Sequence, residues 1–145
     1  MKVRVFVVGA IILMTAGVFR AGAGSQSAPA RSVLEGVFTE EQLKRGSAQF
    51  AEKCSECHCQ DLSGGEIAPG LFGSTFMSSW SGLTVGDLSE RIRLSMPPAN
   101  PERVNRQQNV DIISAILNAN GFPAGKAELE TRLELLRQIK IEAKK

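Results

Sequence analysis

Five consecutive residues carry the clearest chemical signal in the sequence. Cys54, Ser55, Glu56, Cys57 and His58 form a C-x-x-C-H motif, which is typical of covalent attachment of a c-type haem. Two sulfurs three positions apart, at the end of a helical turn, lie on one side of the backbone, where they can form thioethers with the two vinyl groups of one porphyrin. The imidazole that follows can then bind the iron as its proximal ligand. The motif therefore predicts one covalently bound haem c.

Other chemistries use the same residue types and compete with this interpretation. A thioredoxin-like C-x-x-C follows a strand in a βαβ unit, whereas the residues before Cys54 predict a capped helix. A structural zinc site could use Cys54, Cys57, His58 and Cys59, but zinc sites usually draw their ligands from two separated pairs. A chance occurrence in a loop is the third alternative. The sequence favours haem attachment over all three.

The second axial ligand of the iron follows by elimination. His58 is the only histidine and the chain has no tyrosine, so a pair of histidine ligands is impossible. Met77 and Met96 remain once an N-terminal signal is removed. Met96 is followed by Pro97 and Pro98, which stiffen the loop and fix its direction, whereas Met77 is expected to pack in the core. The expected metal ligands are therefore His58 and Met96, a pair that raises the potential of the iron and fills both axial positions.

The first residues predict export. Lys2 and Arg4 precede an apolar run from Val5 to Phe19, and residues 21–23 (Ala-Gly-Ala) form a small-x-small cleavage pattern, which is the order of a secretory signal peptide. The run of about 15 residues is shorter than the roughly 20 that a helix needs to cross a bilayer. We therefore expect a signal peptide over residues 1–23 and a periplasmic protein. Membrane contact is expected only for the alternative, an uncleaved anchor.

Charge and cysteine usage exclude other classes of protein. The full chain has 17 Lys and Arg against 15 Asp and Glu, and residues 1–23 contain three of the basic residues and no acidic one. The remaining chain has fourteen basic and fifteen acidic residues, a net charge of −1. No basic patch interleaved with aromatic residues is present, so nucleic acid is not an expected partner. The three cysteines lie within six residues, which argues against a disulfide framework.

The rest of the sequence predicts an all-α domain. Residues 24–36 are rich in Ser, Ala and Gly and predict a flexible leader, and residues 60–82 predict a loop. Capping patterns at Thr39 and Thr84 begin two helices, the first running to Cys54 and the second ending at Pro97. The second helix directs Leu88 and Ile92 inward. A further helix is expected from about Arg106 to Asn120, with Gly121 as its C-cap, and an amphipathic C-terminal helix over residues 127–143, with Leu129, Leu133 and Leu136 on one side.

With these motifs, residues 38–125 resemble the class I cytochrome c family, most strongly at CSECH (54–58) and at Ser95-Met96-Pro97. The resemblance implies the cytochrome c fold, with three to four short helices around one covalent haem and an exposed haem edge. It also implies that the first helix packs against the last one at Gly46 and Phe50. The resemblance implies further haem-binding roles for three residues. The Pro69 carbonyl would hold the second nitrogen of His58, and Leu71 would contact the porphyrin. Trp80 would donate a hydrogen bond to a haem propionate.

More narrowly, residues 83–125 look like small cytochromes associated with quinoprotein alcohol dehydrogenases. The expected function is that of a periplasmic mono-haem electron carrier that is not itself an enzyme, with residues 37–125 as the cytochrome domain and 126–145 as a helical tail. The resemblance implies a redox partner protein such as a quinoprotein dehydrogenase, a respiratory complex or a terminal oxidase. One residue departs from the family pattern, because Cys59 stands where glycine is common after the motif histidine. An inert thiol is the favoured interpretation of Cys59, with a third haem attachment or an intermolecular link as alternatives.

Overall fold

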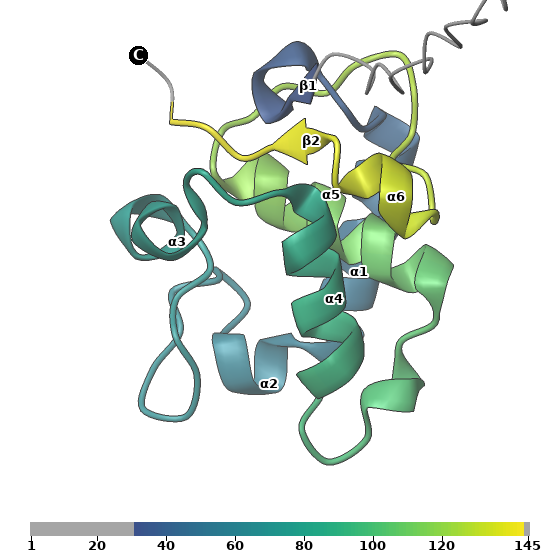
Figure 1. The fold of residues 1–145 in the computed structure, drawn as a ribbon. Coiled ribbons are helices and arrows are strands. Elements are labelled where there is room, and N and C mark those ends of the chain that lie inside the picture. The colour runs from purple at the N-terminus through teal and green to yellow at the C-terminus, as the bar shows by residue number, and fades with distance from the viewer. Residues whose placement is uncertain (1–30, 144–145) are drawn as a thin grey trace, which may run out of the picture.

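The computed structural model describes residues 31–143 and is mostly helical (Figure 1). The two longest helices pack against each other, and a third packs on the second of them. Two shorter helices lie on the opposite side of this third helix from the short helix α6 (Leu133–Leu136). These five are α1 (Glu40–Lys53), α5 (Arg106–Ala119), α4 (Val85–Ser95), α2 (Ser55–His58) and α3 (Gly73–Trp80). The all-α prediction is confirmed for the described residues. No helix among them is long and apolar enough to span a bilayer. The predicted signal peptide lies outside the described residues.

Two of the helices begin with complete capping boxes. The Thr84 hydroxyl accepts a hydrogen bond from the Asp87 backbone N–H, and the Asp87 carboxylate accepts one from the Thr84 backbone N–H. The hydrogen bond from the Thr84 hydroxyl also lowers the pKa of Asp87. Asn105 and Gln108 form the same reciprocal pair at the start of α5. These side chains satisfy backbone N–H groups that the first turn of a helix leaves without partners.

At α1 only half of the expected box forms. The Thr39 hydroxyl accepts from the Gln42 backbone N–H at 3.1 Å, but the Gln42 side chain turns to the C-terminal tail instead of the helix end. Its Nε2 donates to the Leu129 carbonyl at 3.1 Å, and its Oε1 accepts from the Leu129 N–H at 2.8 Å. Gln42 is fully buried, so both halves of its amide are used to hold a distant segment.

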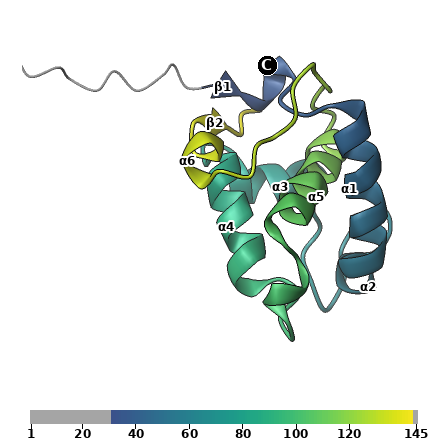
Figure 2. The same ribbon diagram turned by 90° about the vertical axis from the view of Figure 1, so that its right-hand side faces the viewer.

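Helices α1 and α5 cross at the position expected from the sequence (Figure 2). A Cβ atom placed on Gly46 would lie 1.8 Å from the backbone oxygen of Asp111, so only glycine allows the two backbones to come this close. Phe50 is buried one turn further along α1. Arg45 closes the side of the crossing with two hydrogen bonds of 3.1 Å to the Asp111 carboxylate. The glycine that weakens α1 as an isolated helix is thus required by its packing.

The prediction of a loop over residues 60–82 is wrong in its last third, where α3 forms. The sequence of α3 is GSTFMSSW, and Phe72 provides no side-chain cap. Asn120, at the end of α5, replaces that cap, because its Oδ1 accepts from the Gly73 N–H at 2.9 Å. Phe76 is buried and packs on Trp80, with ring centroids 6.3 Å apart. Tertiary contacts therefore stabilise a helix that local sequence preference does not.

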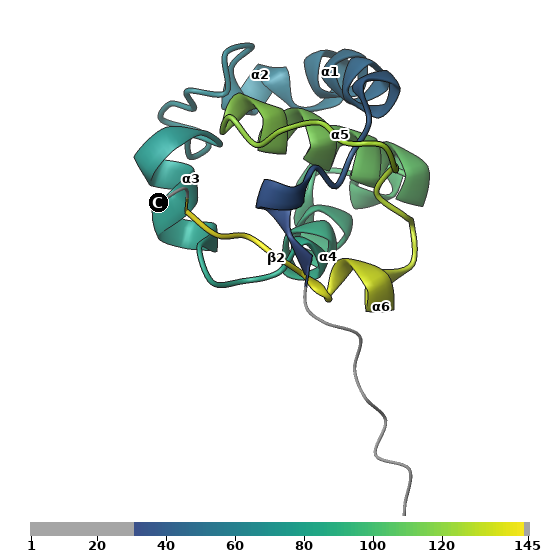
Figure 3. The same cartoon turned by 90° about the horizontal axis from the view of Figure 1, so that it is seen from above.

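The prediction of an amphipathic helix over residues 127–143 is also wrong. Only α6 (Leu133–Leu136) is helical, and the chain then forms β2 (Ile139–Lys140). This tail, residues 126–143, buries apolar side chains within α6 and on both sides of it, namely Leu129, Leu136, Ile139 and Ile141. The alternating burial of Ile139, Lys140 and Ile141 is that of a strand. Figure 3 shows the tail crossing the top of the molecule beside α4.

The expected flexible leader is ordered over residues 31–36. β1 (Arg31–Ser32) pairs with β2 in parallel, with Arg31 opposite Ile139. The chain continues into the 3-10 helix η1 (Val33–Glu35), where Val33 is fully buried. A second 3-10 helix, η2 (Pro101–Arg103), connects α4 to α5. Residues 24–30 of the expected leader lie outside the described residues. The ordered domain thus begins before residue 37 and includes the tail in its core.

Candidate cofactor site

The seven residues that the sequence predicts as cofactor-binding line a single cavity of about 370 Å³. The cavity lies among α1, α2, α3, α4, α5 and the segments that follow His58 and Met96. Most of its wall is apolar, with buried side chains from three helices completing it. The seven predicted residues are Cys54, Cys57, His58, Pro69, Leu71, Trp80 and Met96. The fold therefore gathers residues that are separated by more than forty positions in sequence.

His58 is held in a fixed orientation at the end of α2. It is 7% exposed, and its Nδ1 lies 2.9 Å from the Pro69 carbonyl oxygen. A carbonyl can only accept, so Nδ1 must carry the proton and Nε2 is left as the nitrogen available to a metal ion. A hydrogen bond of this kind fixes the tautomer and the ring orientation of a ligand histidine. The resemblance implied this hydrogen bond, and the structure contains it.

The two candidate methionines differ in position. Met96 follows the last residue of α4 and lines the cavity. Met77, in α3, packs against the apolar core and does not line it. Pro97 and Pro98 also line the cavity, so the segment that Met96 begins forms part of the wall. Of the two thioethers, only that of Met96 belongs to the same cavity as His58.

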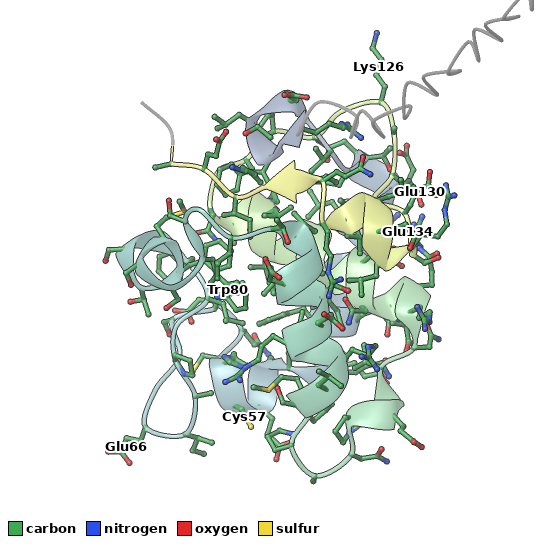
Figure 4. The ribbon with its side chains drawn as sticks, in the orientation of Figure 1. Cys57, Glu66, Trp80, Lys126, Glu130 and Glu134 are labelled. Atoms are coloured by element: carbon green, nitrogen blue, oxygen red, sulfur yellow. The ribbon has the colours of Figure 1, made fainter. Side chains whose placement is uncertain are left out.

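The two motif cysteines lie at the border between α1 and α2. Cys54 is the C-cap of α1, and Cys57 lies within α2 (Figure 4). Burial raises the pKa of the Cys54 thiol to about 11, and the neighbouring Cys57 also raises it. Cysteines that act in thiol–disulfide exchange have a lowered pKa because the thiolate is the nucleophile. The environment of Cys54 is therefore the opposite of a thioredoxin-like one.

The remaining predicted residues lie on other parts of the wall. Trp80 closes the side formed by α3 (Figure 4), and Leu71 lies in the chain that leads to α3, with its carbonyl bound by Asn120. Two cations that no sequence motif marks also line the cavity, Lys53 and Arg91. The Lys53 side chain is only 8% exposed and pairs with Glu52 at 3.0 Å. An apolar cavity with cations at its wall suits an apolar group that bears carboxylates.

Several apolar wall residues were also not assigned to the site from sequence. The helical periodicity marked Leu88 and Ile92 as inward-facing, but it could not distinguish contact with a cavity from contact with another helix, and Ile116 was assigned only to the helix that begins at about Arg106. Phe50 was expected only in the helix crossing, and Val104 and Ile112 had no separate signal. All six of these residues line the cavity.

Cys59 is separate from this cavity. It is exposed, and its Sγ lies 3.4 Å from the Gly64 carbonyl oxygen. Its backbone adopts φ 62° and ψ 159°, a region that is essentially restricted to glycine. Among residues 31–143, no cluster of three or more His, Cys, Asp or Glu side chains is arranged to hold a metal ion. The geometry thus does not gather the four residues of the alternative zinc site.

Replacing Cys59 with glycine is expected to stabilise the protein by about 1 kcal/mol, because glycine adopts this backbone conformation without strain. Urea denaturation of both proteins would measure the difference. Cys59→Ser is the matched control, since serine keeps the strained backbone and removes only the sulfur, and it should leave stability unchanged. An equal increase in the free energy of unfolding in the two variants would show that the sulfur, and not the backbone conformation, destabilises the wild-type protein.

The chain matches no family model, and neither a known protein with a curated description nor a solved structure is similar to it. Its function must therefore be inferred from the sequence motif and from the geometry of the site.

Proposed function

We propose that this chain is a mono-haem c-type cytochrome with the cytochrome c fold, and that it transfers single electrons in the periplasm. Cys54 and Cys57 would hold the haem covalently, and His58 and Met96 would be its axial ligands. A bound haem supplies reversible one-electron oxidation and reduction. The redox partner would be another protein, with a quinoprotein dehydrogenase, a respiratory complex or a terminal oxidase as the candidate classes.

One observation carries the proposal: the C-x-x-C-H motif and the distant Met96 line the same mostly apolar cavity. Nothing in their sequence separation requires this, and the other methionine of the described chain, Met77, does not line it. The donors present, one imidazole and one thioether, are those found on the two sides of the iron in electron-transfer cytochromes. The apolar wall also supports the proposal, because it suits a porphyrin and excludes water.

The residues of this chain would contribute binding, orientation and charge. The Pro69 carbonyl holds the His58 ring with its Nδ1 protonated, which leaves Nε2 for the iron and increases the basicity of the ligand. Pro97 and Pro98 restrict the backbone next to Met96. Lys53 and Arg91, as cations at the wall of the cavity, are suited to carboxylates on the cofactor. No bond of a substrate needs to be made or broken, so the proposal assigns no catalytic residue.

Two other functions would use the same cofactor. A ligand sensor or a peroxidase-like enzyme requires a vacant position on the iron, and the position of Met96 in the cavity wall is the reason we prefer the electron carrier. A purely structural subunit of a larger oxidoreductase would use the tail as its contact. The tail buries its apolar side chains in its own domain, so these side chains are not available to a partner. For this reason we prefer the electron carrier to the structural subunit.

The test is an optical spectrum of protein matured in a host that has haem-attachment machinery. We expect the haem to remain on the chain after denaturation and the reduced protein to show the sharp bands of a c-type haem. Cys54→Ser and Cys57→Ser together should abolish attachment, while Cys59→Ser should not affect it. Haem that is attached but high-spin and binds carbon monoxide would favour the sensor or enzyme. A chain that never acquires covalent haem would refute the proposal.

A further inference from the structure

Helix α4 contacts the tail with one face and lines the cofactor cavity with the opposite face. Gly86 and Glu90, one turn apart, lie against the tail, whereas Leu88 and Ile92 line the cavity. Residues one turn apart share a face of a helix, and residues two positions from them point to the other side. Figure 3 shows α6 and β2 beside α4. A change in the packing of the tail therefore reaches the wall of the cavity through a single helix.

The contact between α4 and the tail is closest at Gly86. A Cβ atom placed there would lie 2.8 Å from the backbone nitrogen of Arg137 and 2.5 Å from its Cγ. One turn further along α4, Glu90 accepts a hydrogen bond of 2.5 Å from the Arg137 guanidinium. Arg137 thus holds α4 in two ways, by packing on Gly86 and by an ion pair with Glu90.

The chain that follows α6 holds the segment just before α4. The Gly82 N–H donates to the Ile141 carbonyl at 2.8 Å, and the Ile141 N–H donates to the Leu83 carbonyl at 2.9 Å. The Ile141 side chain is fully buried, so this contact is anchored in the core. The tail therefore fixes the chain from the entry of α4 to its second turn.

The position of α4 depends on these contacts because its other face borders the cavity. The part of a helix that borders a cavity has no protein atoms packed on it, so the contacts on the remaining surface fix its place. Helix α5 supplies one of them, since Asn109 Nδ2 donates to the Ser89 carbonyl at 3.0 Å. The tail supplies those of Gly86 and Glu90.

Met96 is continuous with α4. It is the C-cap of the helix, and its N–H donates to the Ile92 carbonyl at 2.9 Å. It follows Glu90 by six positions, which is about 9 Å along a helix. Rigid secondary elements carry a displacement from one end to the other. A displacement of the first turns of α4 therefore also displaces the Met96 sulfur.

We propose that the tail positions Met96 through α4, with Gly86 and Arg137 as the positioning residues. Neither of them lines the cofactor cavity, so both act through the helix. When their contact is weakened, a larger fraction of the molecules has Met96 away from the iron. This effect on the iron rests on the proposed function, whereas the effect of the tail on α4 does not.

The first test is a titration of the oxidised haem protein with imidazole, which competes with Met96 for the iron. The apparent affinity for imidazole is proportional to the fraction of molecules whose iron is open. Gly86→Ala would separate α4 from the tail, and Arg137→Ala would remove both the Cγ packed on Gly86 and the ion pair. We expect each variant to bind imidazole about tenfold more tightly than the wild type. Arg137 is exposed, so its variant should fold even if Gly86→Ala does not.

Each variant has a matched control. In Gly125→Ala the added Cβ would lie 2.0 Å from the backbone oxygen of Gly36, a backbone contact that does not include α4. Arg132→Ala removes an arginine whose 2.6 Å ion pair, with Glu130, lies within the tail. Both controls should bind imidazole within about twofold of the wild type. Equal increases in affinity in variants and controls would overturn the proposal, because general loss of stability would then explain the effect.

The second test is hydrogen exchange of the Met96 amide, which requires no haem. We expect exchange about tenfold faster in Gly86→Ala and Arg137→Ala than in the wild type, because the end of α4 opens more often, and no change in the controls. Unchanged exchange in both variants, or unchanged imidazole affinity in a protein with sulfur–iron ligation, would overturn the proposal. Faster exchange in a chain that acquires no haem would support the positioning of Met96 while refuting the proposed function.

Discussion

Met96→Ala is expected to convert the haem protein from a closed electron carrier into one that binds external ligands. The thioether would be lost from the wall of the cavity that holds His58, and alanine has no atom that can replace it. The oxidised wild-type protein should show a weak far-red band typical of sulfur–iron ligation, and the variant should lack it. The reduced variant should bind carbon monoxide, and its potential should fall because a methionine ligand raises it. Optical titration and voltammetry would measure these changes.

Met77→Ala is the matched control, because it removes the same side chain from a position that packs against the core of the same domain. Met77 does not line the cavity, so this variant should keep the far-red band and remain closed to carbon monoxide. Because Met77 is only partly buried against the core, this variant should lose about 1 kcal/mol of stability, less than a fully buried methionine would. If both variants kept the band, the sulfur ligand would have to be sought elsewhere, and the electron-carrier proposal would lose its main support.

Gly46→Ala should destabilise the protein by at least about 3 kcal/mol, although the same change in an isolated helix would stabilise it by about 1 kcal/mol. The added methyl group would lie 1.8 Å from the backbone oxygen of Asp111. No flexible side chain can move to relieve that contact, so α1 and α5 would have to separate. This would also disturb the pairing of Arg45 with Asp111, whose carboxylate is only 4% exposed. Urea denaturation would measure the loss.

Ser47→Ala, at the next and exposed position of α1, is the control for helix propensity and should be neutral or slightly stabilising. The sign of the Gly46 effect therefore distinguishes packing from propensity. A Gly46→Ala protein as stable as Ser47→Ala would mean that the helices do not cross at this position.

The helix starts and the site residues could be predicted from sequence because each depends on short-range chemistry or on a strong motif. The capping patterns at Thr39 and Thr84 act within one turn. The C-x-x-C-H motif fixes the spacing of its own donors, and the prolines after Met96 mark that residue without reference to the rest of the fold. Gly46 was also informative, since a glycine on the apolar face of a helix indicates close contact with another backbone.

Helix α3 and the tail could not be predicted because their conformations depend on distant partners. The first backbone N–H of α3 is bound by Asn120, which lies 47 residues away in sequence. In the tail, the spacing of Leu129, Leu133 and Leu136 is that of a helix, but Gln42 holds both backbone groups of Leu129. That contact, and pairing with β1, favour an extended chain. Lys53 and Arg91 gave no signal because a lysine or arginine in a helix is most often a solvated surface residue.

The buried tail also affects the order of events during biogenesis. Ile139 and Ile141 fill part of the core and pair with the chain near Arg31 and Leu83, yet they emerge from a ribosome or a translocon well after residues 54–58. Until they emerge, the core lacks one side and the domain cannot close. Formation of the complete core is therefore expected only after the last residues of the tail have been made.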